Sequence, residues 1–129
     1  MILLDTSILI TDPALTFDAG QECAASILSR AELELGVAVA DGRVAAVRRR
    51  RLRMLDELFE WLPVTAATTH AYGILAGVLH ASAPAQARRI DTYIAAHALE
   101  LGVPLLTANP KDFERVAHLV TVVAYPRQA

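Results

Sequence analysis

Four acidic side chains stand beside the apolar segments of this sequence, where a buried strand or helix begins or ends. Asp5 directly follows the apolar run Ile2–Leu4 in the opening stretch MILLDTSILI. The others are Glu32, Asp91 and Asp112. A carboxylate at the end of a buried strand loses hydration, so its position requires an interaction that compensates for this loss.

A divalent cation would provide that interaction for all four residues if the fold brings them together. Clustered carboxylates repel one another and therefore need a counter-cation. Oxygen ligands with retained water are typical of Mg²⁺ or Mn²⁺, and the chain has no paired His or Cys ligand set for zinc. A metal held in this way can bind a phosphodiester oxygen and activate a water for attack, which is the chemistry of a nuclease.

Short apolar segments that read as strands determine where these side chains lie. We expect strands at residues 2–4, 22–28, 104–107 and 119–125. The third is followed by the polar stretch ANPKDF, residues 108–113, which we expect to be a loop.

Helical spacing of apolar residues predicts helices between the strands. Ser29 is interpreted as the N-cap of the first helix, in a capping box with Glu32. A second, long helix carries an apolar stripe as far as Leu62, and Pro63 ends it.

The next two helices are predicted in the same way. An apolar stripe marks the third, which we expect to be buried: Ala71, Ile74, Leu75, Val78 and Leu79. The fourth runs from about Asp91 to Leu101, and Gly102 is its expected C-terminal stop.

Strands that alternate with helices favour parallel strands joined by right-handed crossovers. We therefore expect residues 1–129 to form a single domain of the α/β class, a three-layer α/β/α fold with a central, mostly parallel sheet. Ligands of such sheets bind outside the carboxyl ends of the strands. The polar residues expected near this edge are Asp5, Glu32, Asp91, Asn109 and Asp112.

Composition limits the classes of function. The net charge of −2 gives the whole molecule no general attraction for nucleic acid. The single cysteine, Cys23, excludes an intramolecular disulfide and fits a reducing, cytoplasmic setting. We expect no targeting peptide, and no membrane span because no apolar run reaches 18 residues.

Four pieces of the sequence occur in an informative order. They are DTS (5–7), SRAELELG (29–36), IDTYIAAHALELGVPLLTAN (90–109) and PKDF (110–113). Together they resemble the PIN-domain ribonucleases, and specifically the VapC-type toxins of bacterial toxin–antitoxin pairs. The resemblance covers nearly the whole chain. It implies a PIN-like α/β/α fold.

The resemblance also implies roles for residues. It assigns metal binding or its support to Asp5, Glu32 and Asp91, with Asp5 and Asp91 as the direct ligands. Ser7 matches a position where the family has Ser or Asn, and its hydroxyl would orient a ligand or a water.

The fourth acidic position follows one of two patterns in the family. Some relatives have Asp where this chain has Asn109, and others have Asn there with an Asp three residues later. This chain follows the second pattern, so Asp112 is expected to act through water or as an outer group. Asn109 and Thr107 are its expected hydrogen-bond partners, and whether Asp112 or Asn109 completes the site stays open.

The family further implies an RNA substrate, dependence on Mg²⁺ or Mn²⁺, a homodimer, and inhibition by a cognate VapB-like antitoxin. Arg88 and Arg89 precede Asp91 and are candidates for contacts with RNA phosphates. The alternative function is a catalytically silent PIN-like module for interaction or signalling.

Structural roles compete with several of these assignments. Asp5 is a favourable helix N-cap, Glu32 completes the predicted capping box, and Asp91 suits a helix N-terminus. Asp112 fits a solvated loop equally well.

Five arginines between Arg48 and Arg53 predict the solvated face of an amphipathic helix. Asp56, Glu57 and Glu60 would pair with some of them. The alternative is a patch for phosphates or for an acidic antitoxin segment.

Overall fold

Four short strands form a fully parallel sheet in the computed structural model, which describes residues 1–11 and 21–125. The strands are β1 (Ile2–Leu4), β2 (Cys23–Ala25), β3 (Leu105–Thr107) and β4 (Val122–Ala124). Their order across the sheet is β2-β1-β3-β4. The two central strands, β1 and β3, therefore end side by side, and their carboxyl ends lie at the same edge.

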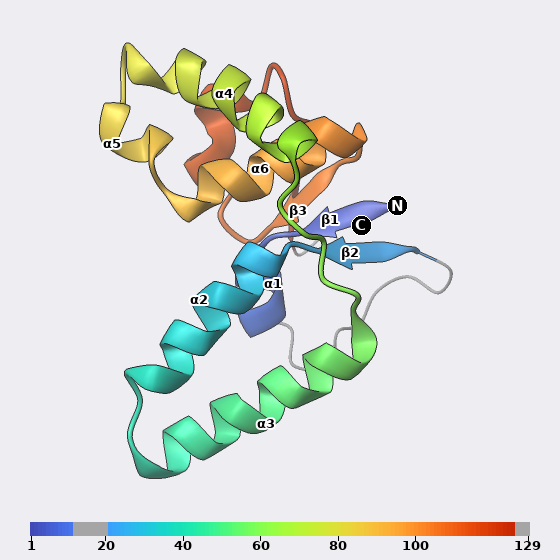
Figure 1. Ribbon diagram of the computed structural model, residues 1–129, viewed down its shortest axis with the longest axis vertical. Helices are drawn as coiled ribbons and strands as arrows, with labels where there is room; N and C mark the ends of the chain where they lie inside the picture. The colour runs from blue at the N-terminus through green and yellow to red at the C-terminus, as the bar shows by residue number, and fades with distance from the viewer. Residues whose placement is uncertain (12–20, 126–129) are drawn as a thin grey trace.

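Helical elements follow each of β1, β2 and β3 along the chain. They are α1 (Thr6–Thr11), α2 (Ile27–Ala38), α3 (Gly42–Leu58), α4 (Ala66–His80), α5 (Pro84–Ala87), α6 (Ile90–Leu101) and a 3₁₀ helix, η1 (Pro110–Val116). The helices α2 to α6 all lie between β2 and β3 in the sequence. Figure 1 shows α4 and α6 together on one side of the sheet, while α2 and α3 form a hairpin that projects away from it.

The core has two parts, one on each face of the sheet. Leu3 points into the first part, which α4, α6 and η1 complete with residues such as Leu75, Ile94 and Phe113. Ile2 and Leu4 point into the second part, where α1 and α3 pack. This alternation is the two-residue period of a strand buried on both faces. The predicted three-layer α/β/α arrangement is confirmed.

The prediction for the segment around Ser29 was wrong in detail. β2 ends at Ala25, and Ser26 is the N-cap of α2, its hydroxyl accepting a hydrogen bond from the Leu28 N–H. This bond satisfies one of the free donors of the first turn, so the N-cap lies three residues before the predicted one. Ser29 lies inside the helix and is fully buried.

The second predicted helix ends earlier than its apolar stripe indicated. α3 stops at Leu58, and Phe59 is already extended. The reason is backbone pairing: the Leu62 N–H donates to Ala25 O at 2.8 Å, and Leu62 O accepts from the Ile27 N–H at 2.9 Å. Leu62 thus continues the edge of the sheet rather than a helix.

Short helical pieces were missed by the sequence patterns. Residues 6–11 form α1, and residues 84–87 form α5. The predicted loop 108–113 is largely η1, which begins at Pro110, a residue whose fixed φ suits the first helical position. β4 covers only 122–124 of the predicted strand 119–125.

Two further predictions concern α4 and α6. α6 spans Ile90–Leu101 and ends at Gly102 with a left-handed φ of 65°, as expected. α4 is buried on one side only, because Ile74 and Val78 are 44% and 39% exposed, so its predicted burial was half wrong. Among the described residues, none of the helices has the length and apolar content to cross a membrane.

Candidate active site

Asp5 is the buried centre of a hydrogen-bond network at the carboxyl ends of β1 and β3. It is only 5% exposed. Its Oδ2 accepts hydrogen bonds from Ser7 Oγ and Thr107 Oγ1, each at 2.8 Å. Its Oδ1 is buried and has no hydrogen-bond partner within residues 1–11 and 21–125. A buried carboxylate oxygen without a partner is costly, so this atom marks a place for a ligand.

The hydroxyls of Ser7 and Thr107 are fixed from the other side by backbone N–H groups. The Ala108 N–H donates to Ser7 Oγ at 3.0 Å, and the Asn109 N–H donates to Thr107 Oγ1 at 3.0 Å. Each hydroxyl therefore accepts one bond and directs its proton at Asp5. Ser7 lies beside Asp5, where the sequence predicted support, whereas Thr107, the expected partner of Asp112, donates to Asp5 instead. Asn109 contributes only its backbone N–H to this network, and the residue is exposed.

Glu32 comes from the second turn of α2 and is held by Thr6. Thr6 Oγ1 donates to Glu32 Oε1 at 2.6 Å and lies 2.8 Å from the hydroxyl of Ser29. Thr6 and Ser29 are both buried. The capping-box interpretation of Glu32 is therefore wrong, because its carboxylate bonds to α1 rather than to the start of its own helix.

Asp91 lies in the first turn of α6, and its side chain is 22% exposed. Burial raises the pKa of Asp91 above its ordinary value, and the nearby charge of Asp5 raises it further. Arg89, whose Nη2 is 3.3 Å from Asp91 Oδ2, opposes this shift, whereas Glu32 and Asp112 add to it. Asp5, Glu32 and Asp112 therefore all lie near enough to Asp91 to influence its ionisation.

Asp112 is the most exposed of the four and belongs to η1. Gln86 Nε2 donates to the Asp112 carbonyl at 2.9 Å, and Thr92 Oγ1 donates to the Gln86 carbonyl at 2.9 Å. Gln86 therefore ties the Asp112 turn to the start of α6. This role could not be read from the sequence, because it depends on a contact between segments 26 residues apart.

The comparisons with known proteins agree with this fold. The sequence profile described as the PIN domain matches residues 2–119. The chain belongs to the PIN domain family. This PIN domain is 38% identical to Ribonuclease VapC4 from Mycobacterium tuberculosis over 111 residues. The match covers 83% of this chain and 85% of that protein.

Solved structures similar to this PIN domain carry the names of toxin–antitoxin systems. VapBC-5 from Mycobacterium tuberculosis is similar with a TM-score of 0.74 and 30% identity, covering 95% of this chain and 94% of that chain. VapBC-1 from nontypeable Haemophilus influenzae is similar with a TM-score of 0.72 and 26% identity, covering 98% and 100% of the two chains.

The donor chemistry of this PIN domain fits a divalent cation. The site offers carboxylate oxygens and hydroxyls, including the unpartnered Asp5 Oδ1. Within the described ranges, His, Cys, Asp and Glu side chains form no group of three that could hold a metal. This arrangement suits an ion that keeps several waters and takes few protein ligands, as Mg²⁺ commonly does.

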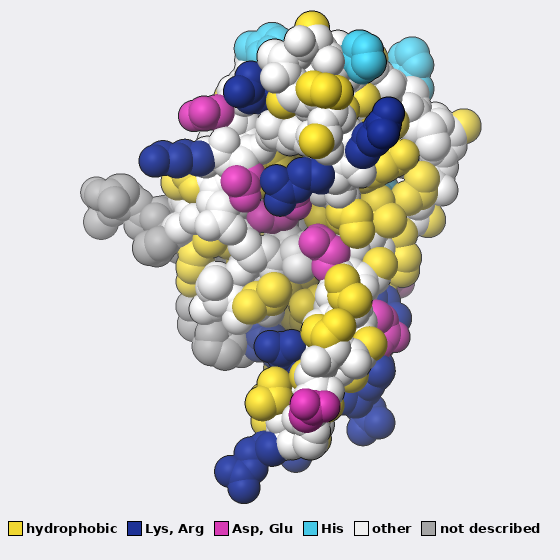
Figure 2. Space-filling model, turned by 90° about the vertical axis from the view of Figure 1, so that its left-hand side faces the viewer, with side chains coloured by type: hydrophobic (Ala, Val, Ile, Leu, Met, Phe, Trp, Pro, Cys, Tyr) yellow, Lys and Arg dark blue, Asp and Glu magenta, His cyan; other side chains and the backbone are white. Residues whose placement is uncertain are grey.

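Basic side chains flank the acidic edge. Arg88 and Arg89 are both exposed, and Arg89 is engaged with Asp91. Figure 2 shows acidic and basic side chains gathered near the middle of one face of the molecule, above its narrow projecting end.

The arginines of α3 divide into structural and exposed groups. Arg49 pairs with Glu34 of α2 at 2.8 Å, while Arg50 and Arg53 are exposed. The expected pairing with Asp56 is not what the structure has, because Asp56 binds Arg30 in a two-pronged ion pair. That guanidinium also lowers the pKa of the Asp56 carboxyl.

Proposed function

We propose that this PIN domain is a divalent-metal-dependent endoribonuclease and the toxin of a VapBC-type toxin–antitoxin pair. The observation that carries the proposal is the buried Asp5 Oδ1, which has no hydrogen-bond partner among the described residues and lies at the edge where Asp5, Glu32 and Asp112 influence the ionisation of Asp91. The 38% identity to a protein named Ribonuclease VapC4 supports RNA as the substrate.

In this proposal Asp5 and Asp91 are the direct metal ligands. When bound, Mg²⁺ or Mn²⁺ supplies a water of lowered pKa and neutralises charge on the phosphate. Ser7 and Thr107 fix the Asp5 carboxylate through Oδ2, which leaves Oδ1 directed at the ligand site. Such outer hydrogen bonds set the orientation of metal-binding groups.

Glu32 and Asp112 complete the proposed catalytic set. Thr6 holds Glu32 at the acidic edge of the sheet through the 2.6 Å hydrogen bond. The carboxylate can then accept a proton, or a hydrogen bond from a water. We propose that Asp112 acts through water; its turn is anchored by Gln86. Asn109 supports Thr107 through its backbone N–H.

A direct test of this function uses a labelled RNA and the purified protein. We expect cleavage with Mg²⁺ or Mn²⁺, loss of cleavage in excess EDTA, and recovery on adding back either ion, because carboxylates alone provide no Lewis acid to activate water or to neutralise charge on the phosphate. Comparing the two ions at equal concentration decides which one supports the faster reaction. Cleavage that persists in EDTA would contradict the metal mechanism.

Arg88 and Arg89 are proposed to contact RNA phosphates. We expect Arg88→Ala and Arg89→Ala each to weaken RNA binding by roughly 3- to 10-fold, with a smaller salt dependence of Kd, because each removes one cationic contact. Fluorescence anisotropy in EDTA measures this binding without cleavage. An unchanged Kd for both variants would contradict the assignment.

The two variants should differ in pH dependence. Arg89 lowers the pKa of Asp91, so its removal leaves the carboxyl protonated up to a higher pH. A protonated carboxyl binds metal poorly, so the acid limb of the pH–rate profile should move to higher pH in Arg89→Ala. Arg88→Ala is the matched control and should keep the wild-type limb. Identical limbs in both variants would contradict this coupling.

The proposed partners follow from the comparisons and from the surface. The solved structures named VapBC support a cognate VapB-like antitoxin. The exposed Ile74 and Val78 of α4 lie in a stretch without charged residues, 63–87, and support a homodimer that covers them. We further propose that residues 1–129 act as one PIN domain in the cytoplasm.

A further inference from the structure

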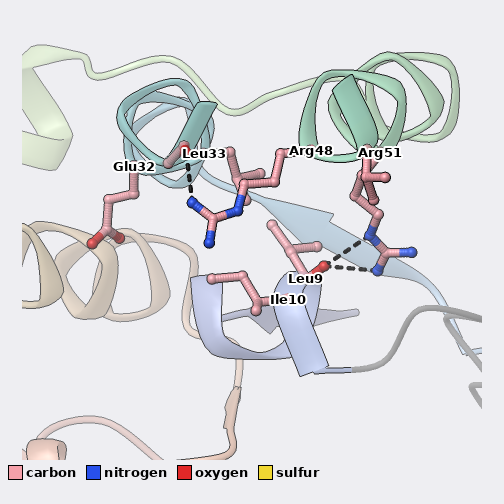
Figure 3. A pocket seen from close by; sticks show the side chains of 8 residues that line it. Leu9, Ile10, Glu32, Leu33, Arg48 and Arg51 are labelled. Atoms are coloured by element: carbon pink, nitrogen blue, oxygen red, sulfur yellow. Dashed lines mark hydrogen bonds between the residues drawn. The ribbon is translucent and has the colours of Figure 1, made fainter. Parts of the chain in front are cut away.

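A groove of about 400 Å³ lies behind the active site, between α1, α2 and α3. Its lining is mostly apolar, from side chains that include Leu9, Ile10 and Leu33. Glu32 reaches it from α2, and two guanidinium groups, of Arg48 and Arg51, enter it from α3, as Figure 3 shows. The groove therefore shares a residue with the proposed active site.

Arg51 uses its guanidinium to hold the end of α1. Its Nη2 and Nε donate to the Leu9 carbonyl at 2.7 and 3.1 Å. In a helix this carbonyl would accept from the residue four positions later, but that residue is Pro13, which has no N–H. A guanidinium also suits a helix C-terminus electrostatically. Arg51 thus replaces a bond that the sequence cannot supply.

The helix held in this way is short and carries active-site groups. α1 has six residues, and a helix of that length is unstable without tertiary support. Its first two residues are Thr6, which bonds Glu32, and Ser7, which bonds Asp5. The buried Ile8 and Leu9 anchor it by packing, and the hydrogen bonds from Arg51 add a directional restraint at its end.

We propose that Arg51 is a positioning residue for the active site, acting through α1 to keep Thr6 and Ser7 aligned with Glu32 and Asp5. The activity part of this proposal rests on the proposed ribonuclease function, whereas its structural part does not. Arg48, one turn earlier, donates instead to the Gly36 carbonyl near the end of α2 at 2.6 Å. Of these two arginines, only Arg51 donates a hydrogen bond to α1 within the residues that the structure describes.

The test compares Arg51→Ala, Arg51→Lys and the control Arg43→Ala, which removes an exposed arginine from the same helix. For Arg51→Ala we expect kcat to fall by about 10-fold with KM within about 2-fold, and Mn²⁺ affinity to fall by roughly 3- to 10-fold, as for other outer-shell changes. Exchange of the Ile8 amide, which bonds the Asp5 carbonyl at 3.0 Å, should become faster. Arg51→Lys should be intermediate, and Arg43→Ala should match the wild type.

Each result decides the proposal. Wild-type kcat and wild-type Ile8 exchange in Arg51→Ala would overturn it, and so would a raised KM with unchanged kcat, which would indicate direct contact with RNA. If the wild type itself cleaves no RNA, the ribonuclease function fails, but Ile8 exchange and Mn²⁺ affinity still decide the role of Arg51. If Arg51→Ala does not fold, Arg51→Lys decides: intermediate values support positioning, and wild-type values overturn it.

Discussion

Replacing Asp91 or Asp5 with asparagine should reduce RNA cleavage by at least about 100-fold, because loss of a direct metal ligand should cost more than the 10- to 100-fold typical of outer-shell changes. Asparagine keeps the shape and most hydrogen bonds of each side chain but removes the charge that attracts the cation. Single-turnover cleavage at saturating metal measures the effect. Glu57→Gln, an exposed carboxylate on α3, is the matched control and should cleave like the wild type.

Asp91→Asn should at the same time stabilise the metal-free protein. The pKa of Asp91 is raised in the folded state, so its ionised form is disfavoured there, and stability falls as pH rises from the unfolded to the folded pKa. Above that window the penalty is complete, and a neutral side chain avoids it. We expect a higher Tm for Asp91→Asn than for wild type at pH 7 in EDTA, with the difference shrinking in acid.

Saturating Mn²⁺ should reverse this order, since a ligand that binds only the folded state raises its stability. Wild type should gain more than Asp91→Asn. Wild-type activity in Asp91→Asn, or an equal gain of both proteins in Mn²⁺, would exclude Asp91 as a metal ligand.

Thr107→Val should damage both activity and stability. The buried Thr107 hydroxyl donates to Asp5 Oδ2 and accepts from the Asn109 N–H, so the substitution removes one bond from the buried Asp5 carboxylate and one acceptor from the Asn109 N–H. We expect a loss of about 1–3 kcal/mol in the free energy of unfolding. Cleavage should fall by roughly 10- to 100-fold, because Asp5 loses one of the two bonds that orient it.

Thr107→Ser is the matched control, because it retains the hydroxyl and loses only a methyl group. It should stay within about 1.5 kcal/mol of wild type by urea unfolding and recover most of the cleavage. If valine and serine behave alike in both measurements, the hydroxyl does not orient Asp5.

The position of Asp5 and Thr107 at one edge of the sheet could be predicted because it depends on the parallel direction of the strands. Apolar runs before Asp5 and up to Thr107 identify β1 and β3, and parallel strands place both ends at one edge. Gly102 fixed the end of α6 because few other residues adopt its left-handed φ. These signals are local, so they can be recognised in a single sequence.

The parts that could not be predicted depend on contacts between distant segments. Ser26 and Ser29 are equally suitable N-caps by residue type. The contact that favours Ser26 comes from Leu62, whose carbonyl accepts from the Ile27 N–H. The arginine run of α3 reads as one charged face, yet Arg51 turns inward to the end of α1. The amphipathic pattern indicates exposure but does not identify which backbone carbonyl a long side chain reaches.

The central claim is that Asp5 and Asp91 hold a divalent cation. Titration of metal-free protein with Mn²⁺, followed by electron paramagnetic resonance of the free ion, tests it without relying on cleavage. Saturable binding by wild type, lost in the Asp5→Asn/Asp91→Asn double variant and retained in Glu57→Gln, is the predicted result. Equal Mn²⁺ binding by wild type and the double variant would contradict the claim.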